Sequence, residues 1–314
     1  MVSYDVLVIG EVLVELSTAE ALRCGAGLRL GFSGDALNVA AAAAAAGART
    51  GLLARVADDE LADGLFERVA ELGVDTALLK RVPGQQGVYI VPADPGGSRE
   101  FVYIRGGSAG STLEPGDLDD VDVFGAGAVV ASGITCALGR PARATVLRAA
   151  QRATRFIYDT NLRLRLTTAA EARAVLREIA PYTALVTPAA PTETRLLLDT
   201  DDPVAAAANC RALGASAAAV TCGPSGVVLD SGSGPRELPA VPPERLVDQT
   251  GAGDSFVGTV AARLVAGDPL ELAVALGGAA ASLSLSGQGG TGRVPSLAET
   301  RAHLAGNTTE QVAQ

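Results

Sequence analysis

The sequence has 314 residues, of which 48% are hydrophobic, and it carries a formal net charge of −10. This length fits one large α/β domain with an insertion, or two domains, and the hydrophobic fraction disfavours disorder. The negative charge disfavours a non-specific nucleic-acid binder, because such proteins need a basic surface. The single histidine, His303, excludes a histidine-based triad and a zinc site built on several histidines.

The four cysteines indicate reduced thiols, because they are too sparse for a disulfide scaffold and are not spaced like metal ligands. The N-terminus carries Asp5 and no basic cluster, so it does not resemble a signal peptide. The longest apolar stretch, residues 121–138, contains Asp122 and several glycines and is too short to span a bilayer. We therefore expect a cytoplasmic protein with no membrane partner.

Strand and helix patterns alternate along the chain. A buried strand is predicted over Tyr4–Ile9, an Ala-rich helix over Ala36–Ala46, a strand over Leu52–Val56 and a helix over Asp58–Leu72. Further strands are predicted at Ala128–Ser132, Phe156–Asp159, Ala184–Thr187, Ala217–Thr221 and Val227–Leu229, with helices at Ala169–Ile179 and Pro203–Leu213. This alternation predicts one α/β domain over residues 1–314, with a doubly wound, mainly parallel sheet and helices on both faces.

Two extended runs interrupt the alternation. Gly87–Pro92 and Arg99–Arg105 are separated by an Asp-Pro-Gly-Gly sequence at residues 94–97, which predicts a β-hairpin. We expect a small β lid built from two segments of the chain, residues 11–17 and 86–105. The exposed edges of the hairpin offer pairing sites for a second subunit, so a homodimer through the lid is an open alternative to a monomer.

The string DQTGAGDSF at Asp248–Phe256 precedes an apolar helical pattern. A Gly-Ala-Gly turn that leads into a helix exposes backbone N–H groups without intrahelical partners, and with the helix dipole these form an anion site. Asp254 would lie in the first turn, where a carboxylate can accept the proton of a substrate hydroxyl. An ordinary turn and helix cap is the simpler interpretation when such a string is isolated.

This string resembles the second signature of the ribokinase (PfkB-type) family of carbohydrate kinases. The resemblance implies that Asp254 is the catalytic base and that the amides of Gly251, Ala252 and Gly253 form the anion hole. It also implies a ribokinase-like fold, ATP and Mg²⁺ as cofactors, a sugar or sugar acid as substrate and, in parts of the family, a monovalent cation. Gln249 departs from the family pattern, which more often has Thr or Ser there.

The string GFSGDALNVA at Gly31–Ala40 is similar to the first signature of the same family. By this resemblance, Gly34 would let a sugar approach the backbone, and Asp35 and Asn38 would bind sugar hydroxyls. A plain helix cap is the alternative interpretation.

The string VTCGPSG at Val220–Gly226 is similar to the nucleotide-phosphate segment of the family. The resemblance assigns ATP contacts to Thr221, Gly223 and Gly226, although a tight hairpin turn would account for the same residues.

A further string departs from the family at one position. The family carries N-x-x-E where this chain has Ala190–Glu193, so Glu193 is retained and Ala190 replaces the usual Asn. By resemblance, Glu193 organises the Mg²⁺ ion through water. The missing amide leaves the catalytic strength of the enzyme open.

Two strings resemble those of the 2-keto-3-deoxygluconate kinase branch: DTNLR at Asp159–Arg163 and YIRGGSA at Tyr103–Ala109. The implied substrate-binding residues are Tyr89, Tyr103, Arg105 and Arg163. In that branch the arginine of the first string binds the substrate carboxylate, so we expect a kinase that acts on 2-keto-3-deoxygluconate or a related sugar acid. The alternative for the tyrosines is a purely structural role in the lid.

Three alternative functions differ in how well the sequence supports them. A fructokinase, ribokinase or nucleoside kinase ranks second, because a neutral substrate does not need both arginines. A catalytically weak sugar-binding paralogue stays open because of Ala190 and Gln249. An NAD-dependent dehydrogenase needs G-x-G-x-x-G after the first strand, and this chain has Gly10-Glu11-Val12 there, so that function is excluded.

Overall fold

The computed structural model describes residues 3–18, 20–91 and 102–312. Its main sheet consists of strands β1 (Val6–Ile9), β4 (Thr50–Ala57), β5 (Val74–Asp75), β6 (Leu79–Val82), β9 (Ala128–Ser132), β10 (Phe156–Asp159), β11 (Leu185–Val186), β12 (Ala218–Thr221), β13 (Val227–Asp230) and β14 (Pro235–Leu238). The strand order is β14-β13-β12-β11-β10-β9-β1-β4-β5, with β6 paired to β4. The strands from β11 to β4 pair in parallel, and β13 and β14 add an antiparallel edge. The predicted mainly parallel sheet is confirmed.

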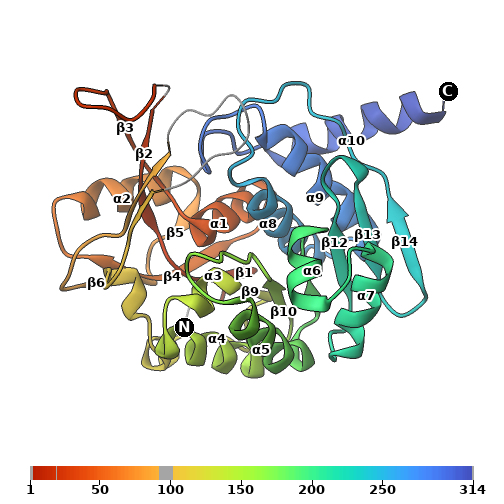
Figure 1. Ribbon diagram of the computed structural model, residues 1–314, viewed down its shortest axis with the longest axis horizontal. Helices are drawn as coiled ribbons and strands as arrows, with labels where there is room; N and C mark the ends of the chain where they lie inside the picture. The colour runs from red at the N-terminus through yellow and green to blue at the C-terminus, as the bar shows by residue number, and fades with distance from the viewer. Residues whose placement is uncertain (1–2, 19, 92–101, 313–314) are drawn as a thin grey trace.

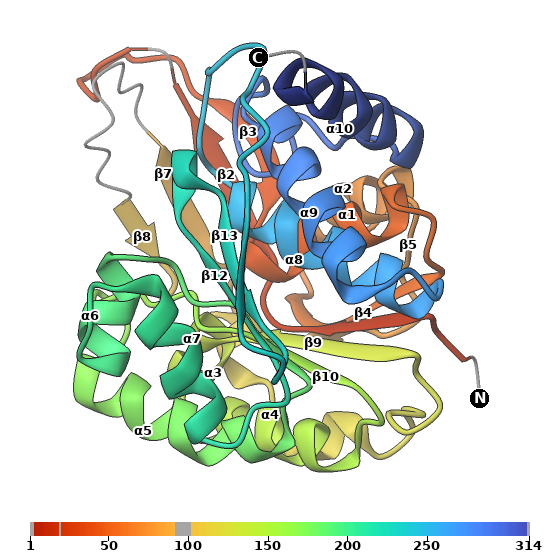
Figure 2. The same cartoon turned by 90° about the vertical axis from the view of Figure 1, so that its right-hand side faces the viewer.

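The helices are α1 (Asp35–Ala45), α2 (Leu61–Glu71), α3 (Gly133–Ala137), α4 (Arg140–Arg152), α5 (Ala169–Ile179), α6 (Thr192–Leu198), α7 (Pro203–Ala212), α8 (Ala252–Val265), α9 (Leu270–Ser284) and α10 (Leu297–Val312). Helices α1, α2, α8, α9 and α10 cover one face of the sheet, and α3 to α7 cover the other (Figure 2). None of the described helices combines the length and the apolar character that crossing a bilayer requires.

The central strand β1 shows why both faces are covered. Its side chains alternate between two hydrophobic cores, with Val6 and Val8 in one core and Leu7 and Ile9 in the other. A strand whose four residues are all buried needs a helical layer on each side.

Helices α1 and α8 lie in close contact on one face. A Cβ atom added at Gly258 would lie only 2.2 Å from the carbonyl oxygen of Val39, so the two backbones approach where a side chain is missing. The facing part of α1 is a run of alanines, which leaves the same space free. This contact brings the N-terminal turns of both helices to the carboxyl ends of the strands.

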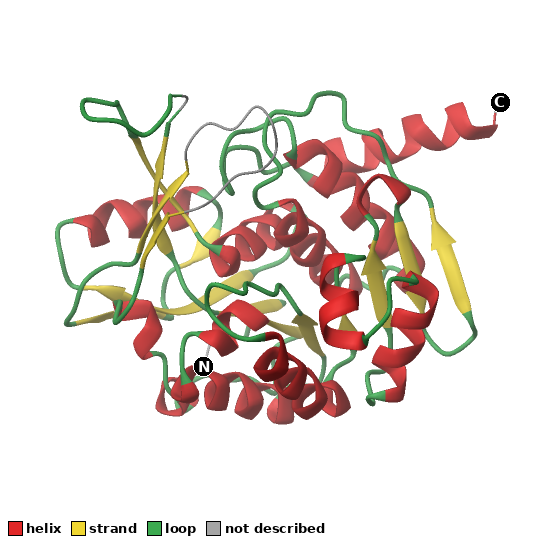
Figure 3. Ribbon diagram, in the orientation of Figure 1, coloured by secondary structure: helices red, strands yellow, loops and turns green. Residues whose placement is uncertain are grey.

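A second sheet forms the lid, with strands β2 (Leu13–Ser17), β3 (Arg29–Ser33), β7 (Val88–Val91) and β8 (Val102–Ile104) in the order β3-β2-β7-β8. It stands apart from the main sheet, at the upper left of Figures 1 and 3. Strands β7 and β8 pair in antiparallel fashion, as the hairpin prediction requires, while the turn predicted at residues 94–97 lies outside the described residues. Strand β3 was not predicted. A homodimer through the lid stays a prediction.

Candidate active site

A cavity of about 850 Å³ lies where the carboxyl ends of the main strands face the lid. Most of the residues singled out from the sequence line it: Gly34, Asp35, Asn38, Tyr89, Tyr103, Arg105, Arg163, Glu193, Thr221, Gly251, Gly253 and Asp254. These residues come from both sheets and from segments at both ends of the chain. The fold therefore brings the separate sequence motifs to one place, as expected for an α/β sheet.

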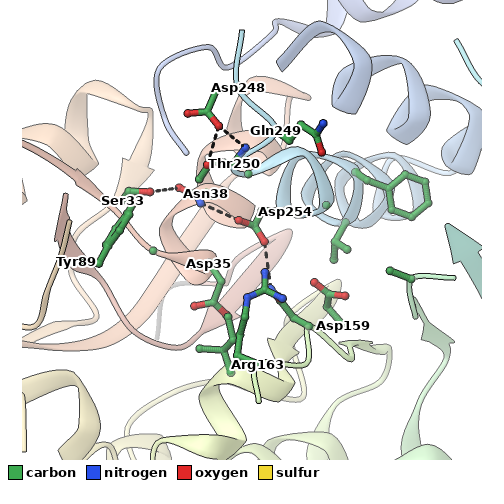
Figure 4. Close-up of a pocket in the computed structure, with 18 of the residues that line it drawn as sticks. Ser33, Asp35, Asn38, Tyr89, Asp159, Arg163, Asp248, Gln249, Thr250 and Asp254 are labelled. Carbon is green, nitrogen blue, oxygen red and sulfur yellow. Dashed lines mark hydrogen bonds between the residues drawn. The ribbon is translucent and has the colours of Figure 1, made fainter. Parts of the chain in front are cut away.

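Asp254 lies in the first turn of α8 with only 8% of its surface exposed. Its Oδ2 atom accepts a 2.7 Å hydrogen bond from Asn38 Nδ2, and its Oδ1 atom accepts a longer one of 3.4 Å from Asn161 (Figure 4). Burial is the main cause that raises the pKa of Asp254 to about 7, and the nearby carboxylate of Asp35 raises it further. A carboxylate with such a pKa is suited to accept a proton near neutral pH.

Asn38 connects Asp254 to the lid. Its Oδ1 atom accepts a 3.0 Å hydrogen bond from the hydroxyl of Ser33, the last residue of β3. Asn38 was predicted to bind a sugar hydroxyl, and that role stays a prediction. In this structure the same amide orients the carboxylate of Asp254. Ser33 and Asn161 were not assigned roles from the sequence, although Asn161 lies inside the quoted DTNLR string.

The turn before α8 only partly matches the predicted anion hole. Gly251 adopts a left-handed conformation with φ 81°, and Gly253 faces open space, since a Cβ atom added there would meet no atom within 4 Å. Both glycines line the cavity, but Ala252 does not, and its N–H donates a 3.3 Å hydrogen bond to the carbonyl of Gln249. The role of the Ala252 amide in an anion hole stays a prediction.

Asp248 holds this turn in place. Its Oδ1 atom accepts hydrogen bonds from the backbone N–H and the hydroxyl of Thr250, at 2.9 and 2.8 Å, and its Oδ2 atom accepts one of 3.0 Å from the N–H of Gly289. The loop before α8 is thereby tied to the loop after α9. No sequence motif predicts this pairing, because the two loops are about forty residues apart.

Two more carboxyl groups lie near Asp254. Asp35 accepts a short hydrogen bond from Ser132, and Asp159 accepts one of 3.0 Å from Thr187. Burial raises the pKa of Asp35, and it raises that of Asp159 well above its ordinary value, followed by repulsion from Glu193. The cavity thus concentrates acidic groups, which makes a positively charged ligand or side chain favourable there.

The two predicted arginines differ in their surroundings. Arg163 is exposed, and its Nη1 atom donates a 3.0 Å hydrogen bond to the carbonyl of Leu162. Figure 4 shows its guanidinium group between Asp35, Asp159 and Asp254. Arg105, in contrast, is 9% exposed and lies 2.5 Å from the carboxylate of Glu11. The two arginines therefore offer the cavity different amounts of net positive charge.

Tyr89 and Tyr103 connect the lid to the cavity wall. Their ring centroids are 6.1 Å apart, and the guanidinium of Arg105 lies 5.5 Å from the ring centroid of Tyr103. The hydroxyl of Tyr89 donates a short hydrogen bond to Glu15 on β2, which also accepts one of 3.4 Å from the N–H of Gly290. Glu15 thereby joins the lid to the loop that follows α9.

The carboxylate of Glu193 is surrounded by donors from the protein. It accepts hydrogen bonds from the hydroxyl of Thr160, from the N–H of Leu162 at 2.6 Å and from the N–H of Ala189 at 2.9 Å. Glu193 therefore fixes the loop that carries Arg163. Its predicted role in organising Mg²⁺ stays a prediction.

The predicted nucleotide segment is placed only in part. Thr221 lines the cavity, whereas Gly223 and Gly226 do not. A Cβ atom added at Gly226 would lie 2.1 Å from the carbonyl oxygen of Leu238, so packing against the end of β14 requires a glycine there. Gly223 has φ 53° and open space around its Cα atom. The ATP contacts assigned to these two glycines stay predictions.

The sequence is similar to a family of known proteins over most of its length. A family profile described as "pfkB family carbohydrate kinase" matches residues 4–297. The 2-dehydro-3-deoxygluconokinase of Thermoproteus tenax is 35% identical over 304 residues, which cover 94% of this chain and 92% of that protein. The 2-dehydro-3-deoxygalactonokinase of Haloferax volcanii is 30% identical over 288 residues, covering 89% and 90% of the two chains.

Solved structures show the same fold. A structure of a putative ribokinase II from E. coli in complex with ATP and Mg²⁺ has a TM-score of 0.86 to this chain at 22% identity. The match covers 96% of this chain and 99% of the other.

Proposed function

Because this chain belongs to the pfkB family of carbohydrate kinases, and is thus an ATP-dependent sugar kinase, we propose that it phosphorylates a short sugar acid such as 2-keto-3-deoxygluconate. Two relatives at 35% and 30% identity are named as kinases of 2-dehydro-3-deoxy sugar acids, which supports an acidic substrate. The observation that carries the proposal is the position of Arg163 in the cavity wall.

Arg163 supplies a cation for the substrate. Its guanidinium lines the cavity, and in the described part of the chain it forms no ion pair within 4 Å. A guanidinium can hold a planar carboxylate through two parallel hydrogen bonds. Since the chain has a net charge of −10, an acidic substrate needs such a local cation to enter the cavity. A neutral sugar offers this guanidinium no carboxylate to bind.

Asp254 is proposed as the catalytic base. It accepts the proton of the attacking hydroxyl while the hydroxyl oxygen forms a bond to the γ-phosphorus of ATP. The bond from that phosphorus to the bridging oxygen breaks, and ADP leaves with the electron pair. Asn38 and Asn161 hold the carboxylate in place, so its oxygen does not have to reorient during the reaction.

The N-terminal turn of α8 is proposed to receive the transferred phosphoryl group. Gly251 and Gly253 line the cavity there, and the positive end of the helix dipole favours the negative charge of the group. Thr221, at the end of β12, would face the phosphates of ATP.

The acidic residues of the cavity fit a Mg²⁺ ion. Asp159 and Glu193 line it together, and their mutual repulsion helps to raise the pKa of Asp159. Carboxylate oxygens and water are the ligands that Mg²⁺ prefers, so these two residues would hold the ion with waters between. When bound, the ion would neutralise charge on the phosphates of ATP.

The test is a competition among substrates. The purified enzyme is given 2-keto-3-deoxygluconate, fructose or ribose with ATP and Mg²⁺, with and without K⁺, and ADP formation is followed. We expect kcat/KM for the acid to exceed that for either neutral sugar. Arg163→Lys should lower kcat/KM for the acid by about 10–150-fold, the effect of one charge-assisted hydrogen bond.

The control variant is Arg195→Lys, which changes an exposed arginine of α6 that is paired with Asp201. It should leave all rates unchanged. A wild-type preference for fructose or ribose would overturn the sugar-acid proposal and favour a neutral-sugar kinase. No phosphorylation of any sugar, in the presence of ATP binding, would favour the sugar-binding paralogue instead.

A further inference from the structure

A buried carboxylate stands behind the cavity wall. Glu11 follows the central strand β1 and is 1% exposed, and it does not itself line the cavity. Its Oε1 atom accepts a 2.8 Å hydrogen bond from the hydroxyl of Ser108, and its Oε2 atom lies 2.5 Å from Nη2 of Arg105. The proposed mechanism does not use this residue.

The space around Glu11 is shaped for its side chain. A Cβ atom added at Gly110 would lie 2.4 Å from Cγ of Glu11, and one added at Gly87 would lie 3.2 Å from its Oε1 atom. The two glycines thus pack directly against the Glu11 side chain, and a larger residue at either position would collide with it. Together with Ser108 they fix it in one orientation, so that it presents Oε2 to Arg105.

Arg105 retains capacity for another partner. Its guanidinium is buried and lines the cavity. Nη2 lies close to Glu11, and both Nε and Nη2 are buried without an acceptor in hydrogen-bonding geometry in the described part of the chain. Nη1 is not among these buried atoms, so it is the nitrogen left to face the cavity. A guanidinium N–H group at a cavity wall can donate a hydrogen bond to a bound ligand.

We propose that Glu11 is a positioning residue that holds Arg105 in the cavity wall through Nη2 and thereby directs Nη1 at the substrate. The inference rests on the proposed sugar-acid function and deepens it. Glu11 also compensates the charge of Arg105, so Arg105 contributes directed hydrogen bonds while Arg163 contributes net charge. An acidic substrate would then be recognised by two arginines with different tasks.

The experiment is a double-mutant cycle at pH 8, where Glu11 is ionised, because burial raises its pKa only to about 7. The four enzymes are the wild type, Glu11→Gln, Arg105→Met and the double variant, each tested with the sugar that the wild type prefers and with fructose. Glu11→Gln should raise KM for the acid about tenfold with little change in kcat, and should lower the ratio of acid to fructose kcat/KM. In the Arg105→Met background, the same change should alter KM less than about twofold.

Two further variants separate positioning from loss of folding. Glu11→Asp keeps the negative charge that balances Arg105 but moves the carboxylate away from Arg105 by one methylene group. It should therefore raise KM for the acid. The control is Glu114→Gln, which removes a surface carboxylate that also pairs with an arginine. It should change no kinetic constant.

Equal effects of Glu11→Gln in both backgrounds would overturn the inference, because Glu11 would then act independently of Arg105. An unchanged KM in Glu11→Gln and Glu11→Asp would overturn it as well. A wild-type preference for a neutral sugar would instead defeat the sugar-acid proposal, and the cycle measured with that sugar would still decide whether Glu11 acts through Arg105.

Discussion

Asn38 and Asp254 are 216 positions apart in the sequence, yet their side chains are joined by a hydrogen bond of 2.7 Å. The amide belongs to α1 and the carboxylate to α8. The hydrogen bond therefore links the two signature strings that the sequence showed separately. Its existence gives the proposed base a fixed direction, and four predictions test the consequences.

Asp254→Asn should lower kcat by about 10²–10⁴-fold, the usual contribution of a positioned base, while ATP binding is retained. The substitution preserves shape and keeps a partner for Asn38. ADP formation and calorimetric ATP binding measure the two effects. Asp201→Asn, at an exposed ion pair, is the control and should be as active as the wild type. A near wild-type kcat in Asp254→Asn would reduce Asp254 to a helix cap.

The pH dependence should report the raised pKa of Asp254. Because the base must be ionised, kcat should rise with pH through about 7 and be level above it. Stability should show the opposite trend: a raised pKa stabilises the fold below the ordinary value of 3.8, and this contribution is lost as pH rises through about 7. Asp254→Asn should thus increase the Tm, relative to wild type, more at pH 8 than at pH 5. An equal difference at both pH values would contradict a raised pKa.

Asn38→Ala should lower kcat by about 10²-fold, since a small misplacement of a catalytic group has effects of this size. The lost donor also stabilised the ionised carboxylate, so the pKa seen in the kcat profile should move above that of the wild type. Asn209→Ala removes an amide that donates to Leu198, away from the cavity, and should leave the profile unchanged. If Asn38 serves only as a sugar ligand, KM will change and the pKa of kcat will not.

The two glycines before Asp254 should respond differently to alanine. Gly251→Ala places a side chain on a residue with φ 81° and within 2.8 Å of the carbonyl oxygen of Gly290, so the Tm should fall. Gly253→Ala meets no protein atom within 4 Å, so the Tm should be unchanged while the methyl group intrudes on the proposed phosphoryl site and lowers kcat. Thermal denaturation and ADP formation measure both variants. Full activity in Gly253→Ala would show that this turn does not bind the transferred phosphoryl group.

The strongly patterned elements of the main sheet were predictable. Strands β9 and β10 and helix α5 have the bounds that the sequence indicated, because apolar runs and flanking turn residues mark their ends. The edge strands β3 and β14 were missed. Most of their side chains are exposed or half-buried, so their sequences lack the apolar pattern by which a strand is recognised.

The position of Asp254 and Arg163 in the cavity was predictable, because a local string singles out each of them, while their chemical roles stay predictions. The partners of these residues were not predictable, because they are defined by tertiary contacts. Nothing in the sequence around Glu11 indicates that its carboxylate meets Arg105, which follows the last of the four lid strands. Likewise, the hydrogen bond from the N–H of Ala252 to the carbonyl of Gln249 depends on the shape of the turn, which the sequence does not indicate.

The close contact of α1 with α8 sets a spacing for the proposed chemistry. A Cβ atom added at Gly258 would lie 2.2 Å from the carbonyl oxygen of Val39, so any larger residue at this position would push the two helices apart. The larger side chain would move Asn38 and Asp254 apart without contacting either of them. The alignment of Asp254 thus depends on Gly258, one helical turn further along α8, having no side chain beyond a hydrogen atom.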